Sequence, residues 1–375
     1  MHVFVKIVAV IFFVTLITGC TDKRIIEEIA FINLMGLDLV NKEDYEKNRH
    51  LLVTASIPQI DPAAEAKREL IFTNAKSDKE AMLNLSRKTN RTIVSGKIKV
   101  ILFGLDLAKN GLNENLDTFE RDPIFGRQVK IVIANGLAHD VMKPEFAEKP
   151  RPSTYIDKLI EKETKMNSIP EALLFQFQRD VADDGKDPAA PMITYADNEV
   201  KIDGIALFQN DKYITKLEPD MSRYFFFLNG DFSAGAINLS FEEKGKESPV
   251  QFMYSALKNS RDIQVKVNKQ EEIDVTLTVN IVGSALEYNG NMDLGKAEDQ
   301  LYLEKKIEEN IEKKSIEIIK TLQTNKVDSL GLGRYVRNKL AYEKWKSMDW
   351  QNEVYPNINI HVEVDAKIKD YGLRT

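Results

Sequence analysis

The chain has 375 residues, of which 43% are hydrophobic and 29% are charged, and these proportions are ordinary for a globular protein. Its 52 Lys and Arg residues are outnumbered by 58 Asp and Glu residues, which gives a net charge of −6. An acidic chain has no electrostatic reason to bind nucleic acid, because contact with phosphates needs an excess of cations. The length exceeds what one hydrophobic core usually serves, so two or three domains are expected.

Residues 1–19 are expected to be a lipoprotein signal peptide. One basic residue, Lys6, precedes an apolar run over 7–17, and the run closes on the letters LITGC. A basic start, an apolar run of about 7–15 residues and a small-residue cleavage site are typical of a secretory signal. A membrane-spanning helix needs about 20 apolar residues, so this run is too short. The closing letters resemble the lipobox of bacterial lipoproteins, in which the cysteine becomes the lipidated first residue.

Cys20 is the only cysteine, so the chain has neither an internal disulfide nor a thiolate metal cluster. A single thiol at the end of the apolar run is expected to be the lipidation site. The alternative is a buried cysteine in a retained membrane segment, but the length and flanks of the run favour a cleaved signal. Two or three acyl chains at one residue hold a protein stably on a membrane. The rest of the chain is therefore expected to be a water-soluble body tied to a bilayer by Cys20.

The first half of the body alternates between predicted strands and helices. Apolar spacing indicates a short helix over 25–32, and strands are expected over 34–38, 51–57, 97–103 and 129–134. The capping-box pattern from Ser77 to Glu80 predicts a helix that runs to about Lys88. Leu112, Leu116 and Phe119 recur at helical spacing. This order predicts an α+β or α/β region with a mixed sheet.

The middle of the chain contains the expected breaks. Three prolines within 143–152 indicate a linker or sub-domain junction. Helices are predicted over 154–165 and 170–181, the second with Pro170 in its first turn. The following segment, 183–188, is rich in Asp but lacks the alternating spacing of a calcium loop, so it is predicted to be a solvated turn.

The second half is a run of strands that ends in helices. Strands are predicted over 200–208, 224–228, 236–242, 250–256, 262–267 and 273–285, and the last alternates strictly between apolar and polar residues. A long helix over 296–325 carries an apolar stripe formed by Ile307, Ile311, Ile318 and Leu322. A second helix over 332–346 and a strand over 358–368 complete the chain. The predicted class is α+β and multi-domain, with mixed sheets and packed helices, and a C-terminal domain of antiparallel strands plus a long helix.

No residues form a recognisable catalytic, cofactor or metal site. The four histidines, at positions 2, 50, 139 and 361, are far apart and lack zinc-binding spacing, so they are interpreted as surface residues. Ser233 lies among glycines but is one residue off the nucleophile-elbow spacing. Gly331 and Gly333 precede a helix without the third glycine of a dinucleotide site, so they are interpreted as a helix-start turn that needs small residues.

An ordered set of short segments points to a family. The set comprises 20–31, 83–88, 96–100, 107–112, 119–123, 204–208 and 328–333, then Trp345, Trp350, Tyr355-Pro356 and 369–373. Together these segments resemble the Ger(x)C family, the C subunits of bacterial spore germinant receptors. Two positions depart from the family pattern: Thr21 stands where a Trp often follows the cysteine, and Lys97 stands where many members have His.

The resemblance implies two germination-protein modules, an N-terminal one over 20–197 and a C-terminal one over 198–375. It also implies a spore germination lipoprotein, with palmitate among the acyl chains on Cys20, on the outer face of the inner spore membrane. The implied partners are the integral membrane A and B subunits of a germinant receptor, and no enzyme activity or cofactor is implied. The alternative is an extracytoplasmic solute-binding lipoprotein of a transporter. Such proteins usually repeat strand–helix units in two lobes, which this chain does not do.

Overall fold

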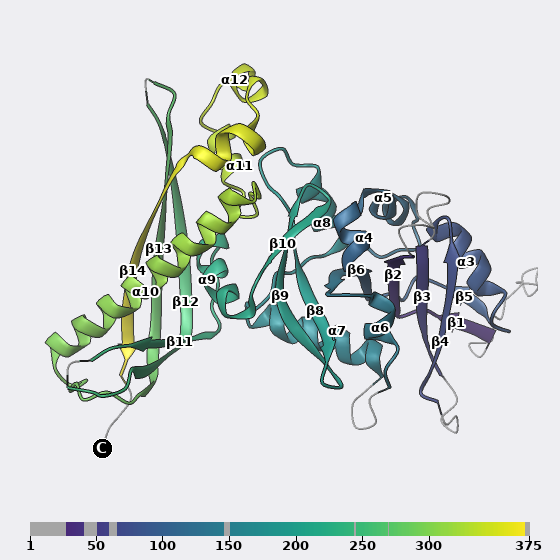
Figure 1. The fold of residues 1–375 in the computed structure, drawn as a ribbon, viewed down its shortest axis with the longest axis horizontal. Helices are drawn as coiled ribbons and strands as arrows, with labels where there is room; N and C mark the ends of the chain where they lie inside the picture. Colours follow the sequence, from purple (N-terminus) through teal and green to yellow (C-terminus); the bar gives the residue numbers. More distant parts are fainter. Residues whose placement is uncertain are drawn as a thin grey trace, which may run out of the picture.

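The structure is a computed structural model, and it describes residues 28–40, 51–59, 66–145, 151–243, 245–268 and 270–371. These residues form two large sheets with their own helices, joined end to end (Figure 1). We call the first sheet and its helices, up to Leu217, the N-terminal unit. The remainder, from Pro219, is the C-terminal unit.

The N-terminal unit is built on an eight-stranded sheet of order β10-β9-β8-β7-β6-β2-β3-β4. Its four central strands, β2, β6, β7 and β8, pair with one another in parallel. The pairs on either side of them are antiparallel. Its strands are β2 (Leu34–Leu39), β3 (Leu51–Pro58), β4 (Arg68–Ala75), β6 (Val100–Gly104), β7 (Lys130–Ala134), β8 (Ala189–Ala196), β9 (Glu199–Gln209) and β10 (Lys212–Leu217). A separate parallel pair joins β1 (Ile29–Phe31) to β5 (Thr92–Val94).

Both faces of this sheet are covered. One face packs against α3 (Asp78–Ser86), α4 (Leu105–Asn110), α5 (Asn113–Arg121) and α8 (Leu174–Val181). The other packs against α6 (Ala138–Met142) and α7 (Pro152–Lys165). Neighbouring residues of β7 therefore enter different cores, Ile131 and Ile133 on one side and Val132 on the other. Burial on both faces explains why the central strands are continuous apolar runs.

The C-terminal unit is built on a four-stranded sheet of order β11-β12-β13-β14. Its strands are β11 (Ala236–Phe241), β12 (Val250–Val267), β13 (Ile273–Tyr288) and β14 (Asn359–Asp370), and its helices are α9 (Pro219–Asn229), α10 (Ala297–Thr324), α11 (Leu332–Arg337) and α12 (Tyr342–Ser347). A π-helical turn, η2 (Trp350–Val354), and a 3₁₀ turn, η3 (Tyr355–Asn357), precede β14. The first three strands are antiparallel, and β14 is parallel to β13.

Among the described residues, only one face of this second sheet is covered. The stripe predicted for the long helix is buried, with Ile307, Ile311, Ile318 and Leu322 each at most 1% exposed, and it packs in one core with Val275, Leu277 and Val279 of β13. The opposite face carries exposed polar residues such as His361 and Glu363. Half-burial of this kind is what produces strict alternation in β13.

The α+β class is confirmed, as are the expected strands near 34–38, 51–57, 129–134 and 273–285 and the long helix. The helix predicted over 25–32 is wrong for its described residues, because Ile29–Phe31 is strand β1. The sequence did not predict strand β4. The strands predicted over 250–256 and 262–267 are one strand, β12. The predicted helix over 332–346 is two short helices, and α8 begins at Leu174 rather than at Pro170.

The predicted strand over 224–228 is also wrong, because it lies within helix α9. Pro219 stands in the first turn, where its fixed backbone angle suits a helix. Tyr224, Phe225, Phe227 and Leu228 are all buried, because α9 lies between the second sheet and strands β9 and β10 of the first. A helix that is buried around most of its circumference loses the apolar period that would identify it.

The segment around 143–152 follows β7 and precedes β8, which pair directly in the same sheet. The sub-domain junction expected there therefore does not separate two sheets. The expected module boundary at 197/198 falls in the turn between β8 and β9, so the eight-stranded sheet extends across it.

Candidate functional site

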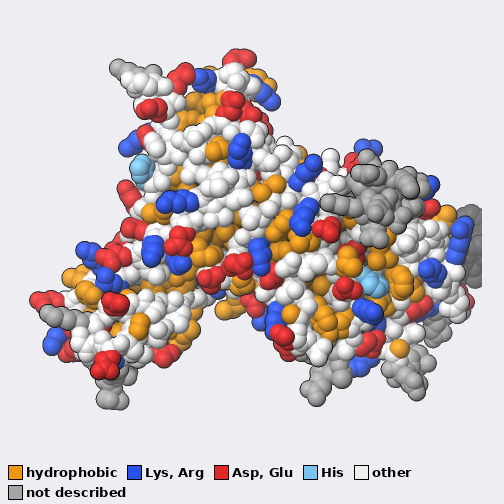
Figure 2. Space-filling model, in the orientation of Figure 1, with side chains coloured by type: hydrophobic (Ala, Val, Ile, Leu, Met, Phe, Trp, Pro, Cys, Tyr) orange, Lys and Arg blue, Asp and Glu red, His pale blue; other side chains and the backbone are white. Residues whose placement is uncertain are grey.

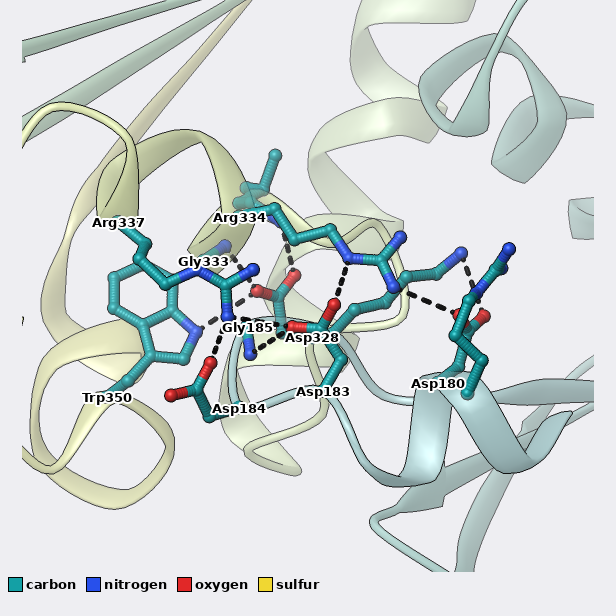
Figure 3. Close-up of polar contacts among 12 residues, drawn as sticks. Asp180, Asp183, Asp184, Gly185, Asp328, Gly333, Arg334, Arg337 and Trp350 are labelled. Atoms are coloured by element: carbon teal, nitrogen blue, oxygen red, sulfur yellow. Dashed lines mark hydrogen bonds and ion pairs between the residues drawn. The ribbon is translucent and has the colours of Figure 1, made fainter. Parts of the chain in front are cut away.

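A densely connected polar cluster lies where the two units meet. The loop between α8 and β8, residues 183–188, packs against residues 327–337, which follow α10 and include α11. We call this contact the seam. Figure 3 shows Arg334 and Arg337 reaching from the C-terminal unit toward the aspartates of the loop.

Asp328 organises the C-terminal side of the seam. It follows α10 by a few residues and is 2% exposed. Its carboxylate accepts hydrogen bonds from the backbone N–H of Leu332 at 2.9 Å, from that of Gly333 at 2.7 Å, and from Trp350 Nε1 at 3.1 Å. The side chain thus satisfies backbone donors that the first turn of α11 leaves unpaired.

Asp187 organises the N-terminal side and is also buried. Its carboxylate accepts from the backbone N–H of Asn210 at 2.8 Å, from that of Asp328 at 2.7 Å, and from Gln351 Nε2 at 2.5 Å. Its own backbone N–H donates to the Asp328 carbonyl at 3.0 Å. Each aspartate therefore holds the backbone of a turn, and Asp187 joins segments that are far apart in the sequence.

Ion pairs flank this buried centre. Arg334 Nε lies 2.7 Å from Asp183 Oδ2, and Arg334 Nη2 lies 3.1 Å from Asp180 Oδ1. Arg337 pairs with Asp183 at 3.1 Å and also with Asp184. Both arginines are about one-third exposed, so each pair is screened less than a free surface pair and more than a buried one. Two arginines and three aspartates form one network, which is worth more than isolated pairs.

Three glycines allow the two backbones to touch. A Cβ on Gly333 would lie 2.5 Å from Trp350 Nε1 and 2.7 Å from the Cα of Gly185. A Cβ on Gly185 would lie 2.7 Å from the backbone nitrogen of Arg334. Gly331 has a φ of +71°, a conformation that favours glycine. The predicted helix-start turn is confirmed, and its small residues serve close packing.

Burial shifts the titration of the central aspartates. It raises the pKa of Asp328 to about 7, although the N–H donors of Gly333 and Leu332 lower it. Burial also raises the pKa of Asp187, against the hydrogen bond from Gln351. Burial also acts to raise the pKa of Asp183, but the hydrogen bonds from the Gly185 N–H and from Arg334 outweigh it and hold that pKa below the usual value. These groups are all engaged in holding backbone or cations.

A cavity of 220 Å³ opens beside the seam. Its lining comes from both units and includes Arg179, Lys186, Phe225, Asn229 and Ser329. Lys186 is committed to Asp180 at 3.0 Å. The Ser329 hydroxyl is buried and has no hydrogen-bond partner among the described residues. The cavity has room for a small polar molecule.

The residues singled out from the sequence lie in different places. The expected lipidation site, Cys20, lies outside the described residues, as do His2 and His50. His139 is half-buried and lies 3.0 Å from the Thr54 hydroxyl, while His361 lies on β14. Within the ranges that the structure describes, His, Cys, Asp and Glu do not form a group of three or more that could hold a metal ion. The helices in those ranges are all too short or too polar to cross a bilayer.

The solvated turn predicted for 183–188 is wrong. Asp187 is 3% exposed, and Asp183 and Asp184 are paired with the arginines of α11. Two features of the sequence were available: the density of acids beside a glycine, and two arginines three residues apart near 334. Nothing in one sequence relates positions about 150 residues apart, so the pairing could not be read from it.

Comparison with known proteins gives consistent matches along the chain. Residues 22–195 match the family described as spore germination protein N-terminal domain, and residues 203–372 match the spore germination B3/GerAC-like C-terminal family. Spore germination protein GerQC of Bacillus cereus is 24% identical over 95% of each chain. Spore germination protein A3 of Bacillus subtilis (strain 168) is 23% identical over 99% of this chain and 98% of its own. The crystal structure of the GerBC protein superposes with a TM-score of 0.58 at 18% identity, over 89% of this chain and 97% of that one, and so shares the fold.

Proposed function

The chain belongs to the GerAC-like spore germination family, and from that membership we propose that it is a lipid-anchored, non-catalytic subunit of a nutrient germinant receptor. The observation that carries the proposal is the match of both family models, which together extend over nearly the whole body. The proposed partners are the integral membrane A and B subunits of the receptor. The proposed location is the outer face of the inner spore membrane.

The proposed anchor is Cys20, because it is the only thiol and closes the lipobox-like run. Acyl chains at one residue keep the body within reach of membrane partners, so weak contacts gain from a high effective concentration. The variant Cys20→Ala should release the body from membranes or leave an unprocessed precursor. Membrane-retained, normally lipidated protein in that variant would contradict the anchor.

A structural role is supported by how the seam uses its ionisable groups. Asp187 and Asp328 bind backbone N–H groups, and Asp183 and Asp184 bind arginines. A catalytic acid or base instead needs a reactive atom open to a substrate. We therefore propose that the body holds and positions its partners and does no chemistry of its own.

The test is a deletion strain. Its spores should germinate poorly with one class of nutrient yet respond normally to a trigger that bypasses receptors. The wild-type gene should restore the response, while the Cys20→Ala gene should not. Normal nutrient responses in the deletion strain, together with purification of the lipoprotein free of any germination membrane subunit, would refute the proposal.

One observation favours a second candidate, a solute-binding lipoprotein of a transporter. The 220 Å³ cavity lies between two units, which is a common place for ligands. In that case the deletion should impair uptake of one solute and leave germination intact, and the solute should raise the Tm of the mature chain. Impaired germination with unchanged uptake would reject this candidate.

A further inference from the structure

Helix α3 presents an unusual stripe to solvent. Lys79, Leu83 and the C-cap residue Arg87 recur every four residues, so they follow one face of the helix. Leu83 is 55% exposed, whereas Ala81 and Leu85 on the opposite face are buried in the core. A large apolar side chain between two cations on an outward face contributes nothing to the core. A stripe of this kind suits a lipid bilayer, in which the apolar interior lies beneath negatively charged headgroups.

The segment around this stripe has a net positive charge, whereas the chain as a whole is negative. Residues 76–97 contain six Lys or Arg residues and only two acids, although the whole chain has a net charge of −6. One of those acids, Asp78, is 4% exposed and bound to Asn115. The cations are Lys76, Lys79, Arg87, Lys88, Arg91 and Lys97. Two of them already have acidic neighbours, since Lys79 pairs with Asp122 and Arg91 with Glu69.

The cations near the end of α3 border an apolar ring. Lys88 Nζ donates to the Phe72 carbonyl at 2.6 Å and lies 5.6 Å from the centre of the Phe72 ring, which is itself 48% exposed. Phe72 belongs to β4, one of the two edge strands of the first sheet. Figure 2 shows Lys and Arg side chains at this end of the molecule, far from the C-terminal unit.

The path of the chain brings this end close to the proposed anchor. β1 pairs in parallel with β5, and the register sets Ile29 beside Thr92, next to Arg91. Glu28, the first described residue, is eight residues after Cys20, and eight extended residues span at most about 28 Å. In Figure 1, β1, β5 and α3 lie together at the end opposite the C-terminal unit. An anchor at Cys20 therefore holds this end near the bilayer.

We propose that the α3 face, defined as Lys79, Leu83, Arg87 and Lys88, lies against the anionic headgroups of the bilayer that holds the anchor. The inference rests on the proposed lipid anchor at Cys20. Negative headgroups attract Lys and Arg within a Debye length, roughly 8–10 Å, and a tether of at most about 28 Å lets the face approach the bilayer to that distance. An anchor with a basic face beside it orients the body, so that the C-terminal unit points away from the membrane.

The test uses the single cysteine of the chain. Once Cys20 is acylated, Leu83→Cys supplies the only free thiol, which is labelled with a fluorophore in the full lipidated chain. The protein is reconstituted in vesicles of phosphatidylcholine, with or without phosphatidylglycerol, that contain nitroxide-labelled lipid. We expect strong quenching in the anionic vesicles, which is largely lost in high salt and in the Arg87→Glu/Lys88→Glu variant.

Matched controls isolate the face. A label at Tyr342→Cys on α12, where the side chain is 68% exposed, should stay unquenched, and Lys313→Glu/Lys320→Glu on α10 should leave quenching at position 83 unchanged. Equal melting temperatures verify that both double variants fold. Protein that stays on the vesicles without quenching at position 83 would overturn the α3-face contact but not the anchor. Quenching that is the same in neutral and anionic vesicles, or that occurs only when a membrane protein is present, would also overturn that contact. Release of the acylated chain from both kinds of vesicle would instead overturn the anchor on which the inference rests.

Discussion

The two sheets of this molecule reach stability by different means. The eight-stranded sheet is covered on both faces, with α3, α4, α5 and α8 on one side and α6 and α7 on the other. In the part of the chain that the structure describes, the four-stranded sheet is covered on one face, chiefly by α10, and leaves its other face to solvent. If a helix on one face of the first sheet is displaced, the core on the other face remains intact. The second sheet depends on one helix, so it should be the more sensitive of the two to a single substitution.

The largest effect is expected from Ile311→Asp on α10. Ile311 is 0% exposed within the core that joins α10 to β13. A carboxylate at this position would lack a partner, so the substitution should cost about 3–5 kcal/mol of unfolding free energy and unfold the C-terminal unit first. Urea unfolding followed by amide exchange in each unit measures this. The matched control is Ile316→Asp, because Ile316 is on the same helix and is 43% exposed. Equal losses from both variants would show that the covered face does not carry the stability.

The next largest effect is expected at the seam, where Asp328→Ala would leave three buried donors without an acceptor. Each such donor costs about 1–3 kcal/mol, and partial relaxation should hold the total near 3 kcal/mol. Because Asp328 lies between the units, this variant should also separate their unfolding transitions. A single transition at the wild-type midpoint in calorimetry would contradict a structural role for the seam.

The same residue predicts a pH dependence. Burial raises the pKa of Asp328 to about 7, whereas an unfolded Asp titrates near 3.9. Between about pH 4 and 7 the folded chain keeps a proton that the unfolded chain releases, so unfolding free energy should fall as pH rises through this window. Asp328→Asn should flatten that fall. Part of the slope should remain, since burial also raises the pKa of Asp38 and of Asp78 to about 6.

A smaller effect is expected from Gly333→Ala, which tests the contact between the two backbones. The added Cβ would lie 2.7 Å from the Cα of Gly185, and that neighbour is backbone and cannot rotate away. Overpacking of this kind costs about 1–3 kcal/mol. Gly126→Ala is the control, because a Cβ there would meet nothing within 4 Å. Comparable melting temperatures for the two variants would mean that the seam can separate freely.

The contrast between the sheets also explains what the sequence could predict. A half-covered sheet leaves its period in the chain, so β13 and the buried stripe of α10 were both predicted from alternation and helical spacing. α9 was misread because its run from Tyr224 to Leu228 is apolar almost all round, and a strand of that length would look the same. The seam was missed for a different reason. Asp183 and Arg334 are both ordinary surface types, and only the fold brings them together.

The edges of the two sheets differ as well. β4 ends the first sheet with Phe72 exposed at its edge, whereas β14 ends the second sheet beneath a row of glutamates from α10. Glu304, Glu308 and Glu312 accept from alternate backbone N–H groups of β14, those of Ile368 at 2.8 Å, Ala366 at 3.1 Å and Val364 at 3.4 Å. Four residues of a helix rise about 6.0 Å and two residues of a strand about 6.6 Å, so the two repeats nearly match. The small mismatch agrees with distances that lengthen along the row.

The smallest effect on stability is therefore expected from Glu308→Ala. The Ala366 N–H would lose its acceptor, but Glu308 is itself only half-buried, so truncating it should let water reach that N–H and the cost should be only about 0.5–1.5 kcal/mol. Its amide exchange should speed up while that of β13 stays unchanged. Glu309→Ala is the matched control, because Glu309 is on the same helix but pairs with Lys306 instead of β14. Removing all three glutamates should open an edge that pairs with other chains, seen as concentration-dependent association by light scattering. A monomeric triple variant with unchanged exchange at Ala366 would show that α10 covers β14 through its apolar stripe alone.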